Sequence, residues 1–122
     1  MSRESYRKIR KRLLDGMMTY MKASEVPGYG YACGYQLKHI DRCAAIVDAF
    51  HAELMTTPKP TPERILKVAK RAVLKLNKLN AACDGALIET DQREDLTQLI
   101  LVAARNAGLK VKEDITEPWR NW

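Results

Sequence analysis

Apolar residues recur at steps of three and four along most of the chain, and this spacing restricts the possible folds more than any other feature. Such a period of about 3.6 places the apolar side chains on one face of a helix. The first series predicts a helix over residues 4–22 and consists of Tyr6, Ile9, Leu13, Met17 and Tyr20. The second predicts a helix over residues 35–55 and consists of Leu37, Ile40, Ala44, Val47, Phe50 and Leu54.

Prolines and glycines mark where the later helices begin and end. Pro58, Pro60 and Pro62 end the second helix by Thr57, because proline lacks the backbone donor that a helix needs. Thr61 followed by Pro62 is a typical N-cap and first position, and Asp84-Gly85 predicts the end of this third helix. A fourth helix is expected from the capping-box pattern of Asp91 and Glu94, or from Thr90, to just before Gly108.

The last residues suggest a fifth, shorter element. Asp114 or Thr116 is expected to cap a brief helical turn, on which Ile115, Trp119 and Trp122 share one face. The sequence therefore predicts an all-α fold: a compact bundle of four main helices with a short C-terminal helical element. At 122 residues the chain is expected to form a single domain over residues 1–122.

Cysteine use and hydropathy suggest a location. Cys33, Cys43 and Cys83 are odd in number and show no CxxC spacing, which favours free thiols in a reducing compartment. No apolar run approaches the roughly 20 residues of a membrane span, and the basic N-terminus lacks an apolar signal core. We expect a cytoplasmic protein with no membrane partner.

Two segments, residues 1–12 and 62–82, each hold six cations and one anion, so each carries +5, and the rest of the chain is acidic and lowers the total to +6. On the third predicted helix the cations fall within an arc of about 80°, opposite the apolar side. This stripe consists of Arg64, Lys67, Arg71, Lys75 and Lys78, and Arg7 and Lys11 on the first predicted helix are expected to add to it. The pattern predicts a binding protein that presents a basic helical face to an anionic macromolecule, with acidic protein and nucleic acid both open.

Two other interpretations of the same charges remain. A basic helix face can simply be solvated, and the acidic residues of the C-terminal third can face the basic residues within the fold or across a homo-oligomer. An inhibitor or immunity-type protein that binds another protein would also have this pattern.

A glycine-tyrosine segment, residues 28–35, is a second candidate binding site. Tyr29, Tyr31 and Tyr35 are spaced by glycines and can stack on bases or line a ligand pocket. The same rings can instead pack at a helix crossing. A small enzyme or ligand-binding protein with its site here and on the second helix is therefore an alternative function.

Residues for catalysis or metal binding are few. His39 and Cys43 are four apart and share a helix face, but no second ligand pair accompanies them. The acidic residues near 89–95 suit the start of a helix, whose partial positive charge they complement. We therefore expect a non-catalytic protein with no metal and no cofactor.

Overall fold

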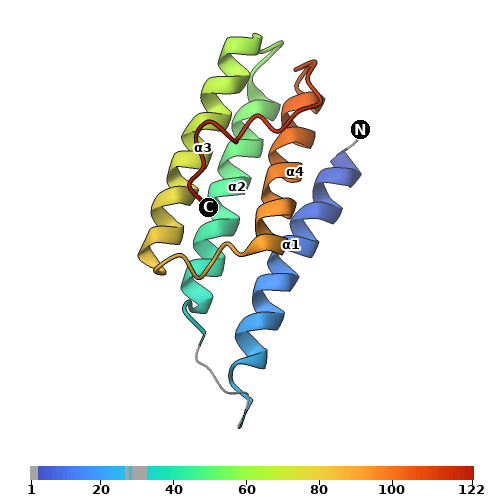
Figure 1. The fold of residues 1–122 in the computed structure, drawn as a ribbon. Coiled ribbons are helices and arrows are strands. Elements are labelled where there is room, and N and C mark those ends of the chain that lie inside the picture. Colours follow the sequence, from blue (N-terminus) through green and yellow to red (C-terminus); the bar gives the residue numbers. More distant parts are fainter. Residues whose placement is uncertain (1–2, 27, 29–32) are drawn as a thin grey trace.

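The protein is a bundle of four α-helices (Figure 1). The structure is a computed structural model and describes residues 3–26, 28 and 33–122. The helices are α1 (Arg3–Ala23), α2 (Leu37–Thr56), α3 (Pro62–Ala82) and α4 (Thr90–Asn106), and the described residues form no strand. Successive helices run in opposite directions, so the all-α fold expected from the apolar periodicity is confirmed.

The bundle is built mainly from two helix pairs. α1 packs most closely on α4, and α2 packs most closely on α3. The predicted apolar series supply most of the core between them, but Leu37, expected on the apolar face of the second helix, lies in the first turn of α2 and is 48% exposed. The largest fully buried side chains include Leu13, Met17, Leu76, Leu96 and Ile100. The buried residues form one continuous cluster, because each helix turns a single apolar face inward.

Local sequence signals account for most helix ends. Thr61 caps α3 by accepting a hydrogen bond from the Arg64 amide at 3.2 Å, with Pro62 at the first helical position. Beyond α3, Gly85 has a φ of 79°, and beyond α4, Gly108 has a φ of 113°. These left-handed conformations favour glycine and end both helices where expected.

The start of α4 differs from the prediction. Its N-cap is Glu89, whose side chain makes no capping hydrogen bond, so the expected capping box at Asp91 and Glu94 is wrong. Thr90 is the first helical residue instead of the cap, and Asp91 lies in the first turn. There its negative charge still complements the positive end of the helix dipole.

The C-terminal segment, residues 113–122, crosses the bundle over α3 and α4 (Figure 1). It is a capped turn where a short helix was expected: Asp114 Oδ1 accepts from the Thr116 amide at 2.8 Å, and the Thr116 carbonyl accepts from Trp119 and Arg120. Asn77 on α3 holds it at two points, donating to the Trp119 carbonyl at 2.8 Å and accepting from the Asn121 amide at 3.2 Å. Trp122 at the end of the segment is buried.

None of the four helices is long and apolar enough to cross a lipid bilayer, as far as the described residues go.

Candidate functional site

The stripe predicted on the third helix lies along the outer side of α3 next to α2, and two of its five members are engaged within the fold. Arg64 Nη2 and Arg71 Nη2 donate to the same oxygen, Glu53 Oε1 on α2, at 3.2 and 2.9 Å. All three side chains are partly exposed. Glu53 therefore offsets part of the positive charge at this end of the stripe.

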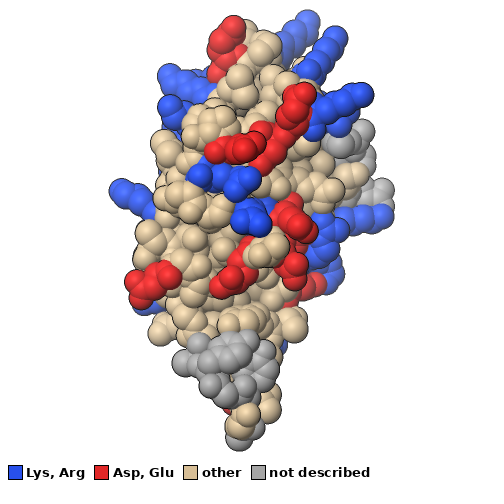
Figure 2. Space-filling model, viewed as in Figure 1, with Lys and Arg blue, Asp and Glu red and all other residues tan. Residues whose placement is uncertain are grey.

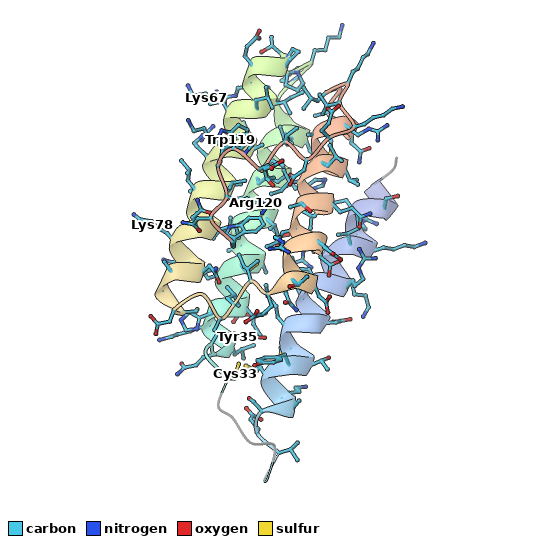
Figure 3. All side chains as sticks on the ribbon, in the orientation of Figure 1. Cys33, Tyr35, Lys67, Lys78, Trp119 and Arg120 are labelled. Atoms are coloured by element: carbon cyan, nitrogen blue, oxygen red, sulfur yellow. The ribbon has the colours of Figure 1, made fainter. Side chains whose placement is uncertain are left out.

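The other three members are exposed lysines. Lys67, Lys75 and Lys78 form no ion pair with another described residue. The side chains of Lys67 and Lys78 extend from α3 away from the bundle (Figure 3). These three ammonium groups are the part of the stripe that remains available to an outside anion.

Unlike the three lysines of the stripe, several basic residues of α1 form ion pairs within the fold. Arg10 forms a two-point ion pair with Asp48 on α2, at 2.7 and 2.8 Å. Arg12 reaches α4, where it donates to Asp95 at 2.7 Å. Lys11 pairs with Asp15 on its own helix, and Arg7 is exposed. The cations of α1 thus mostly link helices or pair locally, and Arg7 and Lys11 lie apart from the α3 stripe.

Next to the exposed lysines, a groove of about 490 Å³ runs between α2 and α3. Its lining consists of Arg42, Ala45, Ile46, Ala49, Lys75, Lys78, Leu79 and Ala82. Three of these residues are cationic and none is acidic, while the alanines, Ile46 and Leu79 are apolar. We call this the α2–α3 groove; it combines an apolar floor with cationic rims.

The apolar floor arises because α2 has a second apolar face. Its core face carries buried residues from Ile40 to Leu54, but Ala45, Ala49 and Ala52 on the outside are exposed. Between Arg42 and Glu53 the one charged residue is Asp48, which turns toward α1 to pair with Arg10. A solvated helix face is ordinarily polar, so this alanine face is unusual.

Sequence reasoning missed the contribution of α2. The signal was present as Ala45 and Ala49, four residues apart and therefore on one face of the helix. Alanine is common in helices, so this spacing alone does not indicate a binding surface. Only the packing of α2 beside α3 shows that these alanines border the lysines.

A larger hollow of about 850 Å³ lies between α1 and α4. Its lining includes the acidic residues Asp91, Glu94 and Asp95 together with Arg12. Figure 2 shows that acidic and basic side chains are also mixed over the face crossed by the C-terminal segment. The lining of the α1–α4 hollow therefore has more acidic than basic residues, and the face crossed by the C-terminal segment carries both, in contrast to the lining of the α2–α3 groove.

The tyrosine candidates separate into two groups. Tyr29 and Tyr31 lie outside the described residues. Tyr35 is buried, and its hydroxyl donates to the Met17 carbonyl at 2.8 Å while its ring lies 6.0 Å from that of Tyr20. Burial, and then neighbouring groups such as Cys33, raise the pKa of Tyr35. Tyr35 is thus packed between α1 and α2 (Figure 3) and has no exposed ring for a ligand.

His39 and Cys43 do not converge on a site. The Nδ1 atom of His39 accepts a hydrogen bond from the Gln36 amide at 2.9 Å, which helps to cap α2. Cys43 is fully buried in the core, where desolvation and then Asp48 raise the pKa of its thiol to about 12. In the described part of the chain, no three His, Cys, Asp or Glu side chains are grouped as metal ligands.

The α2–α3 groove and its lysines are thus the site that the geometry favours for interaction. Comparison of the chain with protein-family models, with curated proteins and with solved structures finds no match to any of them.

Proposed function

We propose that the protein is a non-catalytic binding protein whose α2–α3 face holds an anionic macromolecule. The observation that carries this proposal is the position of Lys75 and Lys78, exposed and beside Arg42, in a lining without any carboxylate. Ammonium and guanidinium groups placed together in this way raise the local positive potential and attract anions. Lys67 extends the same charge along α3.

The ion pairs of the bundle support this choice of face. On α1, Arg10 pairs with Asp48 and Arg12 pairs with Asp95. The two arginines of the stripe both pair with Glu53. The three lysines have no such partner among the described residues, so we expect ions of the solvent to balance their charges. A partner that replaces those ions gains affinity at low salt and loses it as salt rises.

The test is a charge-reversal variant, Lys67→Glu/Lys75→Glu/Lys78→Glu, compared with a matched variant on another face. The matched variant is Arg105→Glu/Lys110→Glu/Lys112→Glu, which has the same net charge and changes three exposed cations of a separate hollow of about 380 Å³ at and beyond the end of α4. This second hollow also lacks carboxylates, so the comparison tests which of the two cationic faces binds. Both proteins are applied to immobilised poly-L-glutamate and to immobilised duplex DNA and eluted with a salt gradient. Arg64 and Arg71 are left in place, because reversing them would set carboxylates against Glu53.

We expect the α3 variant to elute at clearly lower salt than the matched variant from at least one of the two matrices. Circular dichroism should show the same helical content for both, because exposed substitutions usually change stability by less than about 0.5 kcal/mol. Equal elution of the two variants from both matrices would contradict the proposed face.

A further inference from the structure

We infer that the occupant of the α2–α3 groove is an acidic amphipathic helix of a partner protein. This inference rests on the proposed function and narrows it from anionic macromolecules in general to one class of protein segment. It depends on the juxtaposition of an exposed alanine face, an apolar groove floor and three cations in one lining.

The floor of the groove favours protein over nucleic acid. Ala45 and Ala49 of α2 are exposed, Ile46 is half-buried, and Ala82 of α3 is exposed beside them. A phosphate backbone gains nothing from such surface, whereas apolar side chains of a peptide are removed from water there.

The small side chains favour a helical occupant. Alanines at positions 45 and 49 lie one turn apart, so they leave a shallow channel along α2 in which another helix can approach closely. The groove continues past Phe50 to Glu53 and Arg71 through a small hollow of about 50 Å³. From Arg42 to Glu53 this is roughly 16 Å, or about three turns of a docked helix.

The charges indicate what the flanks of that helix carry. Lys75 and Lys78 form one rim and Arg42 stands on the other, so carboxylates on both sides of the apolar stripe of the occupant would meet a cation. At the far end Glu53 is already paired with Arg64 and Arg71. The acidic residues of the occupant therefore belong over the end of the groove nearest Arg42 and Lys78.

The other grooves of the bundle differ in a way that supports an external occupant. The α3–α4 side is covered by the C-terminal segment, held by Asn77. The α1–α4 hollow is lined largely by polar and acidic side chains. No described segment of the chain lies over the α2–α3 groove, whose lining holds three cations, no carboxylate and a larger share of apolar side chains than the α1–α4 hollow.

The test distinguishes binding to the apolar floor of the groove from simple attraction to its cations. Ala49→Arg fills the channel with a long side chain and also adds a positive charge, so it opposes helix docking but favours simple attraction of an anion. Ala81→Arg is the matched control, because Ala81 is exposed on α3 and lies outside the groove lining. Both changes keep a strong helix former on an exposed helix position, so both proteins should fold.

The probe is a fluorescein-labelled peptide of about 18 residues, long enough to form helix on binding, with leucines on one helix face and glutamates on both flanks. A peptide of the same composition with the leucines spread around the helix is the peptide control. A single-stranded and a duplex oligonucleotide serve as the nucleic-acid probes. Binding is measured by fluorescence anisotropy with the wild type, both arginine variants and Lys75→Glu/Lys78→Glu.

We expect Ala49→Arg to weaken binding of the amphipathic peptide about tenfold or more, and Ala81→Arg to leave it unchanged or slightly tighter. The control peptide should bind more weakly than the amphipathic peptide. Unchanged or tighter binding of the amphipathic peptide to Ala49→Arg would overturn the inference. Tighter binding of an oligonucleotide than of the peptide would also overturn it, in favour of nucleic acid.

The lysine reversal distinguishes this failure from failure of the proposed function. If Lys75→Glu/Lys78→Glu weakens binding of every anionic probe while Ala49→Arg weakens none, the face binds anions without a docked helix. If neither variant has an effect, the proposed function fails as well. A wild-type dimer in sedimentation velocity that Ala49→Arg abolishes would identify a second copy as the occupant and overturn the inference.

Discussion

Among the glycines that the structure describes, Gly34 is the one whose added Cβ would make the closest contact. A Cβ built there would lie 2.3 Å from the Cβ of Ala86, in the connection between α3 and α4. We expect Gly34→Ala to lower the free energy of unfolding by about 1–3 kcal/mol, because overpacking forces backbone shifts. Removing the opposing carbon with Ala86→Gly should restore most of that loss in the double variant, as measured by urea unfolding.

Gly16 provides the contrasting control. A Cβ on this α1 residue would have its nearest contact with the Gln92 side chain at 3.6 Å, an ordinary packing distance. Gly16→Ala should therefore raise the free energy of unfolding by up to about 1 kcal/mol through helix propensity. For Gly34, the contradicting result is a Gly34→Ala/Ala86→Gly variant that loses as much free energy of unfolding as Gly34→Ala alone. The contact with Ala86 would then not be the cause of the loss.

The buried thiol of Cys43 predicts a loss of stability in alkali. Burial, with Asp48 adding a smaller effect, raises its pKa from 9.0 to about 12. The folded state therefore keeps the proton that the unfolded chain releases, so this contribution is complete below pH 9.0 and is lost as the pH rises toward 12. Each such group steepens the fall by up to about 1.4 kcal/mol per pH unit.

Urea unfolding at a series of pH values above neutrality measures this dependence. Cys43→Ala should show a shallower fall than the wild type, whatever its absolute stability. Some slope should remain, since burial also raises the pKa of Tyr6 and Tyr35. An unchanged slope in Cys43→Ala would mean that the thiol titrates alike in both states.

Among the elements, the C-terminal segment is the one whose attachment is most easily measured. Deletion of residues 115–122 removes buried Thr116 and Trp122 and both hydrogen bonds to Asn77. We expect the melting temperature to fall by several degrees, because about 1 kcal/mol shifts a domain of this size by roughly 4 °C. Thermal unfolding followed by circular dichroism tests this.

A second variant shows whether Asn77 is part of that attachment. Asn77→Ala should cost about 1–2 kcal/mol in the full chain, where it leaves the segment without two hydrogen bonds. In the chain without residues 115–122, Asn77→Ala should hardly change the free energy of unfolding. Equal effects in both backgrounds would place the role of Asn77 elsewhere.

The helices were predictable because their signals are local. Apolar spacing, the Thr61-Pro62 start and the glycines after α3 and α4 act within one or two turns, so the sequence alone located the helices to within about two residues. The C-terminal turn was harder to predict. Asp114 does cap it, but Pro118 lies inside it and the chain then turns toward Asn77, which is a contact between distant residues.

For the whole molecule, salt should affect binding far more than folding. The interhelical ion pairs of Arg10, Arg12, Arg64 and Arg71 are partly exposed, and such pairs contribute at most about 1 kcal/mol each. Screening also relieves the repulsion within a chain of net charge +6. We expect the melting temperature to change by no more than about 3 °C between roughly 0.05 and 0.5 M NaCl.

Over the same range, retention on an anionic matrix should be lost if the α3 lysines bind as proposed. Differential scanning calorimetry and salt-gradient elution of one preparation measure the two effects. A large fall in melting temperature with salt would mean that weakened binding reflects unfolding, and the charge-reversal experiment would then need variants of matched stability.

The candidate site was only partly visible in the sequence, because charge and periodicity describe one helix at a time. They identified the five cations of the α3 stripe, but not that Glu53 would lie between Arg64 and Arg71. They also gave no reason to join Arg42 to Lys78, which belong to different helices that meet only in the bundle. Such pairings depend on which helix faces lie next to each other, and side-chain spacing does not encode that choice.

The fluorescence of the two tryptophans can report on the C-terminal segment separately from the helices. Trp119 and Trp122 are the only tryptophans of the chain, and both lie in the segment that crosses α3 and α4. Tryptophan emission therefore reports whether the C-terminal segment is packed on the bundle, whereas far-ultraviolet circular dichroism reports the helical content. If the emission changes at a lower temperature than the helical content, the C-terminal segment detaches in a separate step before the bundle unfolds.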